Sequence, residues 1–106
     1  MNELKIALDK EGFVADLNTW NENVAALLAS NEKIELTTEH WDVITALRDF
    51  YNEYQLSPAM RPLVKYLKLQ LDKPDLNSIY LLNLFPGSPA KVAAKIAGLP
   101  KPENCL

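Results

Sequence analysis

The sequence contains only one cysteine and one histidine among its 106 residues. A single cysteine excludes an intramolecular disulfide. Cys105 and His40 together cannot supply the four ligands of a structural zinc site either. The chain must therefore be held together by its apolar core, and any chemistry of a thiol must come from Cys105.

Long apolar runs are also missing. No stretch approaches the roughly 20 apolar residues that span a bilayer, so we expect no membrane partner. Residues 1–10 lack the apolar region of a secretory signal. With so little cysteine, these features predict a cytoplasmic protein in a reducing environment.

An excess of positive charge is lacking as well. Eleven basic and fourteen acidic residues give a net charge of −3, whereas proteins that hold nucleic-acid phosphates depend on a basic surface. The charges are unevenly spread, because acids dominate residues 1–53. The second half could present a local basic face, formed by Arg61, Lys65, Lys68, Lys91, Lys95 and Lys101.

What is present is a composition that can fold. Hydrophobic residues make up 48% of the chain, and 106 residues fit one domain. We expect a single domain over residues 1–98 and a flexible C-terminal arm over residues 99–106 that carries the reactive cysteine. Apolar residues alternate on both sides of Gly12, which predicts a β-hairpin over residues 3–17.

The rest of the domain has helical periodicity. The predicted class is mainly α (α+β), with an N-terminal β-hairpin, five helices and an extended C-terminal arm. The second and third helices would form a helix-turn-helix-like pair. The helices are expected over about residues 19–30, 38–54, 58–71, 74–84 and 88–97.

Residues with capping chemistry suggest where these helices begin and end. Asn18 or Asp16 could cap the first helix and Thr37 the second. Ser57 and Pro58 have the chemistry of an N-cap and a first helical residue. Gly98 is expected to end the last helix.

The C-terminal arm contains Pro100, Pro102 and Cys105. Two prolines at alternate positions favour an extended, partly stiff segment, which could reach roughly 25 Å from Gly98 to Cys105. Position alone favours an incidental terminal cysteine, whereas the proline-spaced arm after a capped helix favours a functional one. Lys101 and Arg61 are the candidates for stabilising a thiolate or a persulfide.

The most specific motif of the chain is Lys95-Ile96-Ala97-Gly98-Leu99-Pro100-Lys101-Pro102, followed by Cys105 and one more residue. It resembles the C-terminal arm of the DsrC/TusE family of sulfur carriers. The resemblance extends over nearly the whole chain. The further motifs are Asp9 to Trp20, Leu36-Thr37-x-x-His40-Trp41, Ser57-Pro58-x-x-Arg61, Tyr80 to Pro86 and Gly87-x-Pro89-Ala90-Lys91.

This resemblance implies a sulfurtransferase that carries a persulfide on Cys105 without a metal or an organic cofactor. Family members of the DsrC branch have a second cysteine where this chain has Ala94, so the single-thiol TusE pattern is implied. That pattern implies 2-thiolation of the wobble uridine of tRNA. A TusBCD-type complex would donate the sulfur and a MnmA-type thiouridylase with its tRNA would accept it. The free carrier is expected to be a monomer.

Two other functions are compatible with the sequence. The helix-turn-helix-like pair with Arg61, Lys65 and Lys68 could bind nucleic acid. Alternatively, the chain could be a non-catalytic docking subunit of a sulfur-metabolism enzyme. His40 could serve as a base for the thiol, although a structural role beside Trp41 is the more common one for such a histidine.

Overall fold

The computed structural model describes residues 6–103, and residues 1–5 and 104–106 lie outside the described part. The fold is mainly helical, as predicted, and the described residues contain five α-helices after a short 3₁₀ turn. The elements are η1 (Leu17–Thr19), α1 (Glu22–Asn31), α2 (Thr38–Tyr54), α3 (Met60–Gln70), α4 (Ser78–Leu84) and α5 (Pro89–Ile96).

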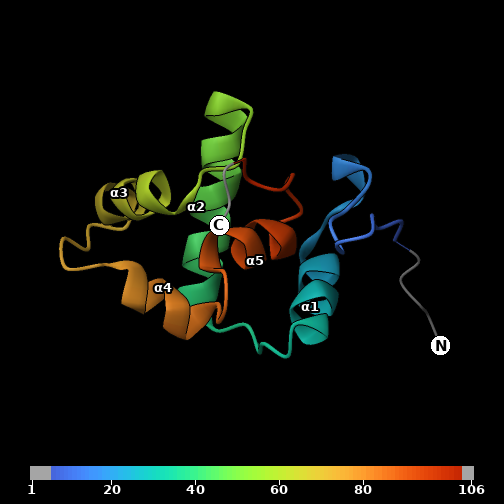
Figure 1. Ribbon diagram of the computed structural model, residues 1–106, viewed down its shortest axis with the longest axis horizontal. Helices are drawn as coiled ribbons and strands as arrows, with labels where there is room; N and C mark the ends of the chain where they lie inside the picture. Colours follow the sequence, from blue (N-terminus) through green and yellow to red (C-terminus); the bar gives the residue numbers. More distant parts are fainter. Residues whose placement is uncertain (1–5, 104–106) are drawn as a thin grey trace.

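Helix α5 is the centre of the domain and contacts each of the other four helices (Figure 1). Most of its residues are buried, and three of them are alanines: Ala90, Ala93 and Ala94. Small side chains allow neighbouring helices to approach closely, which explains how so short a helix can be surrounded on several sides. The segment that leads to Cys105 therefore starts from the most enclosed helix of the fold.

The two-stranded hairpin predicted over residues 3–17 is not confirmed. In the part of the chain that the structure describes, the pairing is a single antiparallel bridge between Leu8 and Val14. The Asp9 carboxylate accepts the backbone N–H groups of residues 11 and 13, which makes a tight turn. The Asp16 side chain then caps η1, so the returning segment bends away before a second strand can form.

Helix α2 has the bounds that its periodicity predicts, and Thr37 is its N-cap. His40 is buried there and has a structural role. Its Nδ1 accepts the Thr37 backbone N–H at 3.0 Å, so Nε2 carries the proton and donates to the Leu84 carbonyl at 2.8 Å. Both ring nitrogens are thus occupied, which links α2 to the end of α4.

Three predicted helix starts are wrong. Asn21 caps α1 and Asn77 caps α4, each with its side chain. Helix α3 begins at Met60 after Ala59, and not at Ser57 and Pro58. With this start Pro62 falls in the first turn, where a backbone N–H has no partner within the helix. The Ser57 hydroxyl instead donates a hydrogen bond to the Pro100 carbonyl of the C-terminal arm.

No helix within residues 6–103 is long and apolar enough to cross a membrane.

Candidate functional site

Cys105, the residue predicted to carry the chemistry, lies outside the described residues. The structure describes the base of its arm, from Gly98 to Glu103, and both predicted supporting residues. Lys101 lies on the arm, and Arg61 is exposed in the first turn of α3.

The arm leaves α5 through a Schellman turn. The Leu99 N–H donates to the Ala94 carbonyl at 3.0 Å, and the Gly98 N–H donates to the Lys95 carbonyl at 3.1 Å. Gly98 has a φ of +74°, as predicted for the residue that ends the helix. Leu99 is then only 2% exposed, so the first residue of the arm is part of the core.

Trp20 and Arg48 hold this turn from outside. The Trp20 indole N–H donates to the Ile96 carbonyl at 2.8 Å, and the Arg48 guanidinium donates to the Ala97 carbonyl. The guanidinium also stacks 3.9 Å from the centroid of the Trp20 ring. Burial lowers the pKa of Arg48 from its ordinary value. A Cβ on Gly98 would lie 2.2 Å from Trp20, so only glycine fits there without displacing the indole.

Ser57 fixes the next part of the arm. Its hydroxyl, in a residue that is 6% exposed, donates to the Pro100 carbonyl at 2.6 Å. Pro102 is also buried. The chain is thus packed against the domain as far as Pro102, three residues before Cys105. Because a residue spans at most about 3.6 Å, this leaves a reach of about 11 Å beyond Pro102.

Lys101 lies between the two prolines and pairs with the N-terminal turn. Its ammonium donates to the Glu11 carboxylate at 2.9 Å, and Lys91 lies 3.8 Å from the same carboxylate. The hydrogen bond from Lys101, aided by the charges of both lysines, lowers the pKa of Glu11. The group is exposed, so salt screens this attraction, and its contribution is to position the arm rather than to hold the fold.

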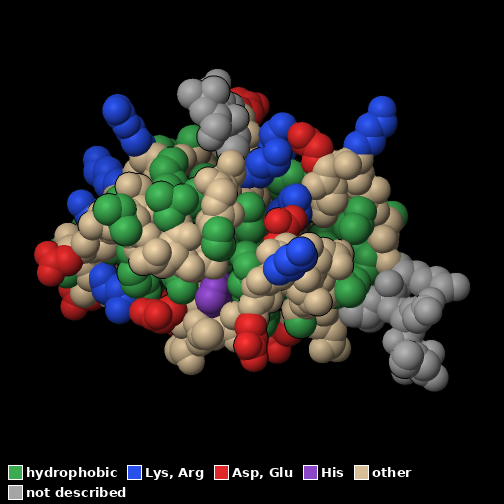
Figure 2. Space-filling view, turned by 60° about the horizontal axis from the view of Figure 1, so that its bottom comes forward, with side chains coloured by type: hydrophobic (Ala, Val, Ile, Leu, Met, Phe, Trp, Pro, Cys, Tyr) green, Lys and Arg blue, Asp and Glu red, His purple; other side chains and the backbone are tan. Residues whose placement is uncertain are grey.

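Three of the six residues of the predicted basic face form such pairs. Lys91 and Lys101 share Glu11, and Lys95 pairs with Glu32 at 2.9 Å. On the face shown in Figure 2, basic and acidic side chains are interspersed over the described residues. Arg61, Lys65 and Lys68 are exposed on α3, and none of the hydrogen bonds or ion pairs within residues 6–103 involves Arg61. The three lysines of this face that lie outside α3 are thus paired, whereas the three cations on which the nucleic-acid alternative rests stay exposed on α3.

An open groove of about 380 Å³ runs beside the arm, where the segment after α5 passes the C-terminal end of α2 (Figure 1). We call it the arm groove. Its lining is mostly apolar and comes from the end of α2, the start of α3 and the arm itself. The lining residues are Phe50, Gln55, Leu56, Ser57, Pro58, Ala59, Pro62, Pro100, Lys101 and Glu103. No local sequence signal predicts this groove, because its walls are about 40 residues apart in the chain.

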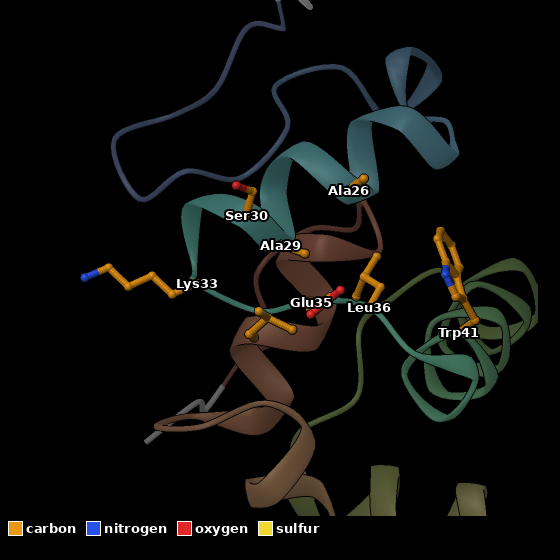
Figure 3. A pocket seen from close by; sticks show the side chains of 8 residues that line it. Ala26, Ala29, Ser30, Lys33, Glu35, Leu36 and Trp41 are labelled. Atoms are coloured by element: carbon orange, nitrogen blue, oxygen red, sulfur yellow. The ribbon is translucent and has the colours of Figure 1, made fainter.

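A second, more open pocket of about 570 Å³ lies between α1 and the start of α2. Figure 3 shows Ala26, Ala29 and Ser30 along α1 and Trp41 on α2, with the Lys33 side chain extending away from them. Its polar groups do not converge on one point, and no residue of the arm lines it. Of these two pockets, the arm groove is therefore the one that lies beside the described part of the arm.

Comparison with known proteins identifies the relatives of this chain. The sequence profile of the family described as "DsrC like protein" matches residues 1–106. "Sulfurtransferase TusE homolog" of Haemophilus influenzae is 49% identical over 106 residues, which cover all of this chain and 97% of that protein. "Sulfurtransferase TusE" of Salmonella paratyphi A is 47% identical over 102 residues, covering 96% and 94% of the two chains.

A solved structure has the same fold. The NMR structure of Allochromatium vinosum DsrC superimposes with a TM-score of 0.86 at 48% sequence identity, and the match covers 95% of this chain and 90% of that one. The similarity therefore extends over the helical domain in three dimensions as well as in sequence.

Proposed function

The chain belongs to the DsrC family, and on that premise we propose that it is a sulfurtransferase of a sulfur relay that carries a persulfide on Cys105. The observation that carries the proposal is the 49% identity, over the entire chain, with a protein named as a TusE sulfurtransferase homolog. Cys105 is the only cysteine in the sequence, so it is the only residue that can form the persulfide.

The chemistry is an exchange between thiolates. The Cys105 thiolate attacks the terminal sulfur of a persulfide on the donor protein, so that a new S–S bond forms on Cys105 and the donor S–S bond breaks. The donor cysteine leaves as a thiolate, and the number of electrons on the two proteins together is unchanged. In the second step the persulfide of Cys105 is the donor, and a cysteine of the acceptor is the nucleophile. This exchange needs no metal or organic cofactor.

The position of the arm supports such an exchange. Residues 99–102 are held against the domain by Ser57, by the core and by Glu11. A short segment on a fixed base presents a thiol with less loss of conformational freedom on docking than a fully free tail would. Lys101, four residues before Cys105, and Arg61, next to Pro62 of the arm groove, are the cations we propose to stabilise the thiolate or persulfide.

We further propose the partners of a TusE-type relay. A TusBCD-type complex would load Cys105, and a MnmA-type thiouridylase with its bound tRNA would receive the sulfur for 2-thiolation of the wobble uridine. The carrier would work as a monomer in the cytoplasm. Its single thiol fits this relay, because this chain has Ala94 where the family resemblance implies a second cysteine in the DsrC branch.

The test is intact-protein mass spectrometry after incubation with a cysteine desulfurase, cysteine and the donor complex. We expect a gain of one sulfur atom that maps to Cys105, is removed by a reductant and does not occur in Cys105→Ser. The Cys105→Ser variant should keep its circular dichroism spectrum and fail to support tRNA thiolation. If a loaded donor leaves the carrier mass unchanged, a docking subunit or a nucleic-acid-binding protein becomes the better explanation.

A further inference from the structure

We propose that the arm groove is the docking surface for the protein that delivers sulfur to Cys105, and that it takes an exposed apolar side chain of that protein. The inference rests on the proposed sulfur carriage and adds the place where the donor binds. The occupant is defined by its chemistry: a protein with a persulfide-bearing cysteine and, close to it, an apolar side chain on its surface.

The first argument is the exposed apolar rim of the groove. Leu56 lines it and is 53% exposed, and Tyr54, at the end of α2, is 50% exposed. The Tyr54 ring packs on Phe50, which lines the groove, with ring centroids 4.6 Å apart. Apolar and aromatic side chains that rim a mostly apolar hollow are typical of protein interaction sites.

The backbone explains why Leu56 is exposed. Gln55 ends α2 in the left-handed conformation with a φ of +59°, and its N–H donates to the Tyr51 carbonyl. The two residues after Leu56, Ser57 and Pro58, are both buried. Leu56 is thus held exposed between the end of α2 and the buried residues Ser57 and Pro58. Contact with a partner would bury its apolar side chain, which the fold itself leaves in water.

The second argument is the distance from the groove to the reacting residue. Glu103 lines the groove and precedes Cys105 by two residues. The Cα atoms of Glu103 and Cys105 can therefore be no more than about 7 Å apart. A protein that brings its own cysteine into contact with Cys105 must therefore come close to the groove wall, near enough for a protein surface of ordinary size to cover the groove.

Other exposed apolar residues of the described chain have no such position. Leu69 on α3 is 77% exposed and Ile79 on α4 is 64% exposed, and neither lines the arm groove. Leu69 is a matched control for Leu56, because it is the same residue type and is also solvent-exposed. Asparagine is close to leucine in size and uncharged, so it removes the apolar contact and leaves the charge around Cys105 unchanged.

The experiment compares Leu56→Asn with Leu69→Asn in two measurements. The first is binding of the donor complex to each variant in a Cys105→Ser background, where no sulfur can move. The second is the rate at which Cys105 gains sulfur, either from the donor complex or from inorganic polysulfide. Polysulfide transfers one sulfur atom to the thiolate and is released as a polysulfide with one sulfur atom fewer. Inorganic polysulfide has no protein surface that could dock in the groove, so its loading rate depends on the reactivity of the Cys105 thiol alone.

We expect Leu56→Asn to weaken donor binding by about tenfold, the loss of about 1.4 kcal/mol typical of an interface contact. Loading by the donor complex should slow similarly, loading by polysulfide should not change, and Leu69→Asn should behave like the parent. Equal binding of the two variants would overturn the proposal. So would a parent chain that sediments as a dimer and becomes a monomer with Leu56→Asn, because the groove would then hold a second copy.

The two proposals can fail separately. If neither donor nor polysulfide adds sulfur to Cys105, sulfur carriage is wrong. The binding measurement uses Cys105→Ser and so still decides whether the groove is a docking surface.

Discussion

Gly98→Ala tests whether the arm base depends on the contact between Gly98 and Trp20. Gly98 has a φ of +74°, and a Cβ there would lie 2.2 Å from Trp20 Cδ1. Gly87 offers a matched control, because its φ is +93° and a Cβ there meets nothing within 4 Å. Alanine at either position must adopt the left-handed conformation, whereas only at position 98 must it also displace the indole.

The expected difference in stability follows from these contacts. The left-handed conformation costs alanine about 1 kcal/mol at either position. At position 98 the displaced Trp20 also loses its hydrogen bond to the Ile96 carbonyl, about 1 kcal/mol, and its stacking with Arg48, also about 1 kcal/mol. We therefore expect Gly87→Ala to lower the free energy of unfolding by about 1 kcal/mol and Gly98→Ala by about 3 kcal/mol. In a domain of this size these losses lower Tm by about 4 °C and about 12 °C.

Urea and thermal unfolding, followed by far-UV circular dichroism, measure both variants. The cause is tested by repeating Gly98→Ala in a Trp20→Ala background, where we expect the cost to fall to that of Gly87→Ala. Equal losses for the two glycine variants, or the same loss for Gly98→Ala with and without Trp20, would refute this reasoning. The effect of the alanine side chain on the unfolded chain is similar at both positions and cancels in the comparison.

Two further predictions concern single hydrogen bonds. Ser57→Ala removes the donor to the Pro100 carbonyl, so we expect a loss of about 1 kcal/mol in urea unfolding and faster amide exchange at Lys101; unchanged exchange would contradict its role as the arm anchor. Burial and the hydrogen bond to Glu39 raise the pKa of Tyr80 to about 12. Because this pKa is above the ordinary value of 10.0, the contribution of the neutral phenol to stability is complete below pH 10 and declines as the pH rises to 12. A spectrophotometric titration should show a step near pH 12 that is missing from Tyr80→Phe.

The sequence predicted the elements whose signals are local. Apolar periodicity placed α2 correctly, Thr37 was expected as its N-cap, and Gly98 was expected at the end of α5. These signals lie within a few residues of the feature that they specify, so no knowledge of the rest of the fold is needed.

The errors arose where another group competes for a cap, or where the chain turns away. Ser57 was expected to cap α3, but its hydroxyl donates to a carbonyl 43 residues away. Asn18 or Asp16 was expected to cap α1, but Asp16 caps the 3₁₀ turn before that helix and Asn21 caps α1. The hairpin was predicted from alternating apolar residues, which indicate strands but do not reveal that the chain turns away after the bridge between Leu8 and Val14.

The candidate site was predictable in part. The sequence pointed to Cys105, Lys101 and Arg61, and the family resemblance assigned the chemistry. Lys101 and Arg61 lie within the described residues and Cys105 lies outside them. The arm groove and the role of Glu11 could not be predicted, because both depend on segments that meet only after folding.

The packing of the arm as far as Pro102 has a consequence for how a relay would be timed. A thiol on a segment that reaches about 11 Å beyond Pro102 cannot move between two proteins bound on different sides of the domain. In the proposed relay, donor and acceptor would therefore bind at the same place in turn, and the first would dissociate before the second binds. Such a carrier works best with short-lived complexes, so its throughput would be governed by dissociation rates, and very tight binding to either partner would act as inhibition.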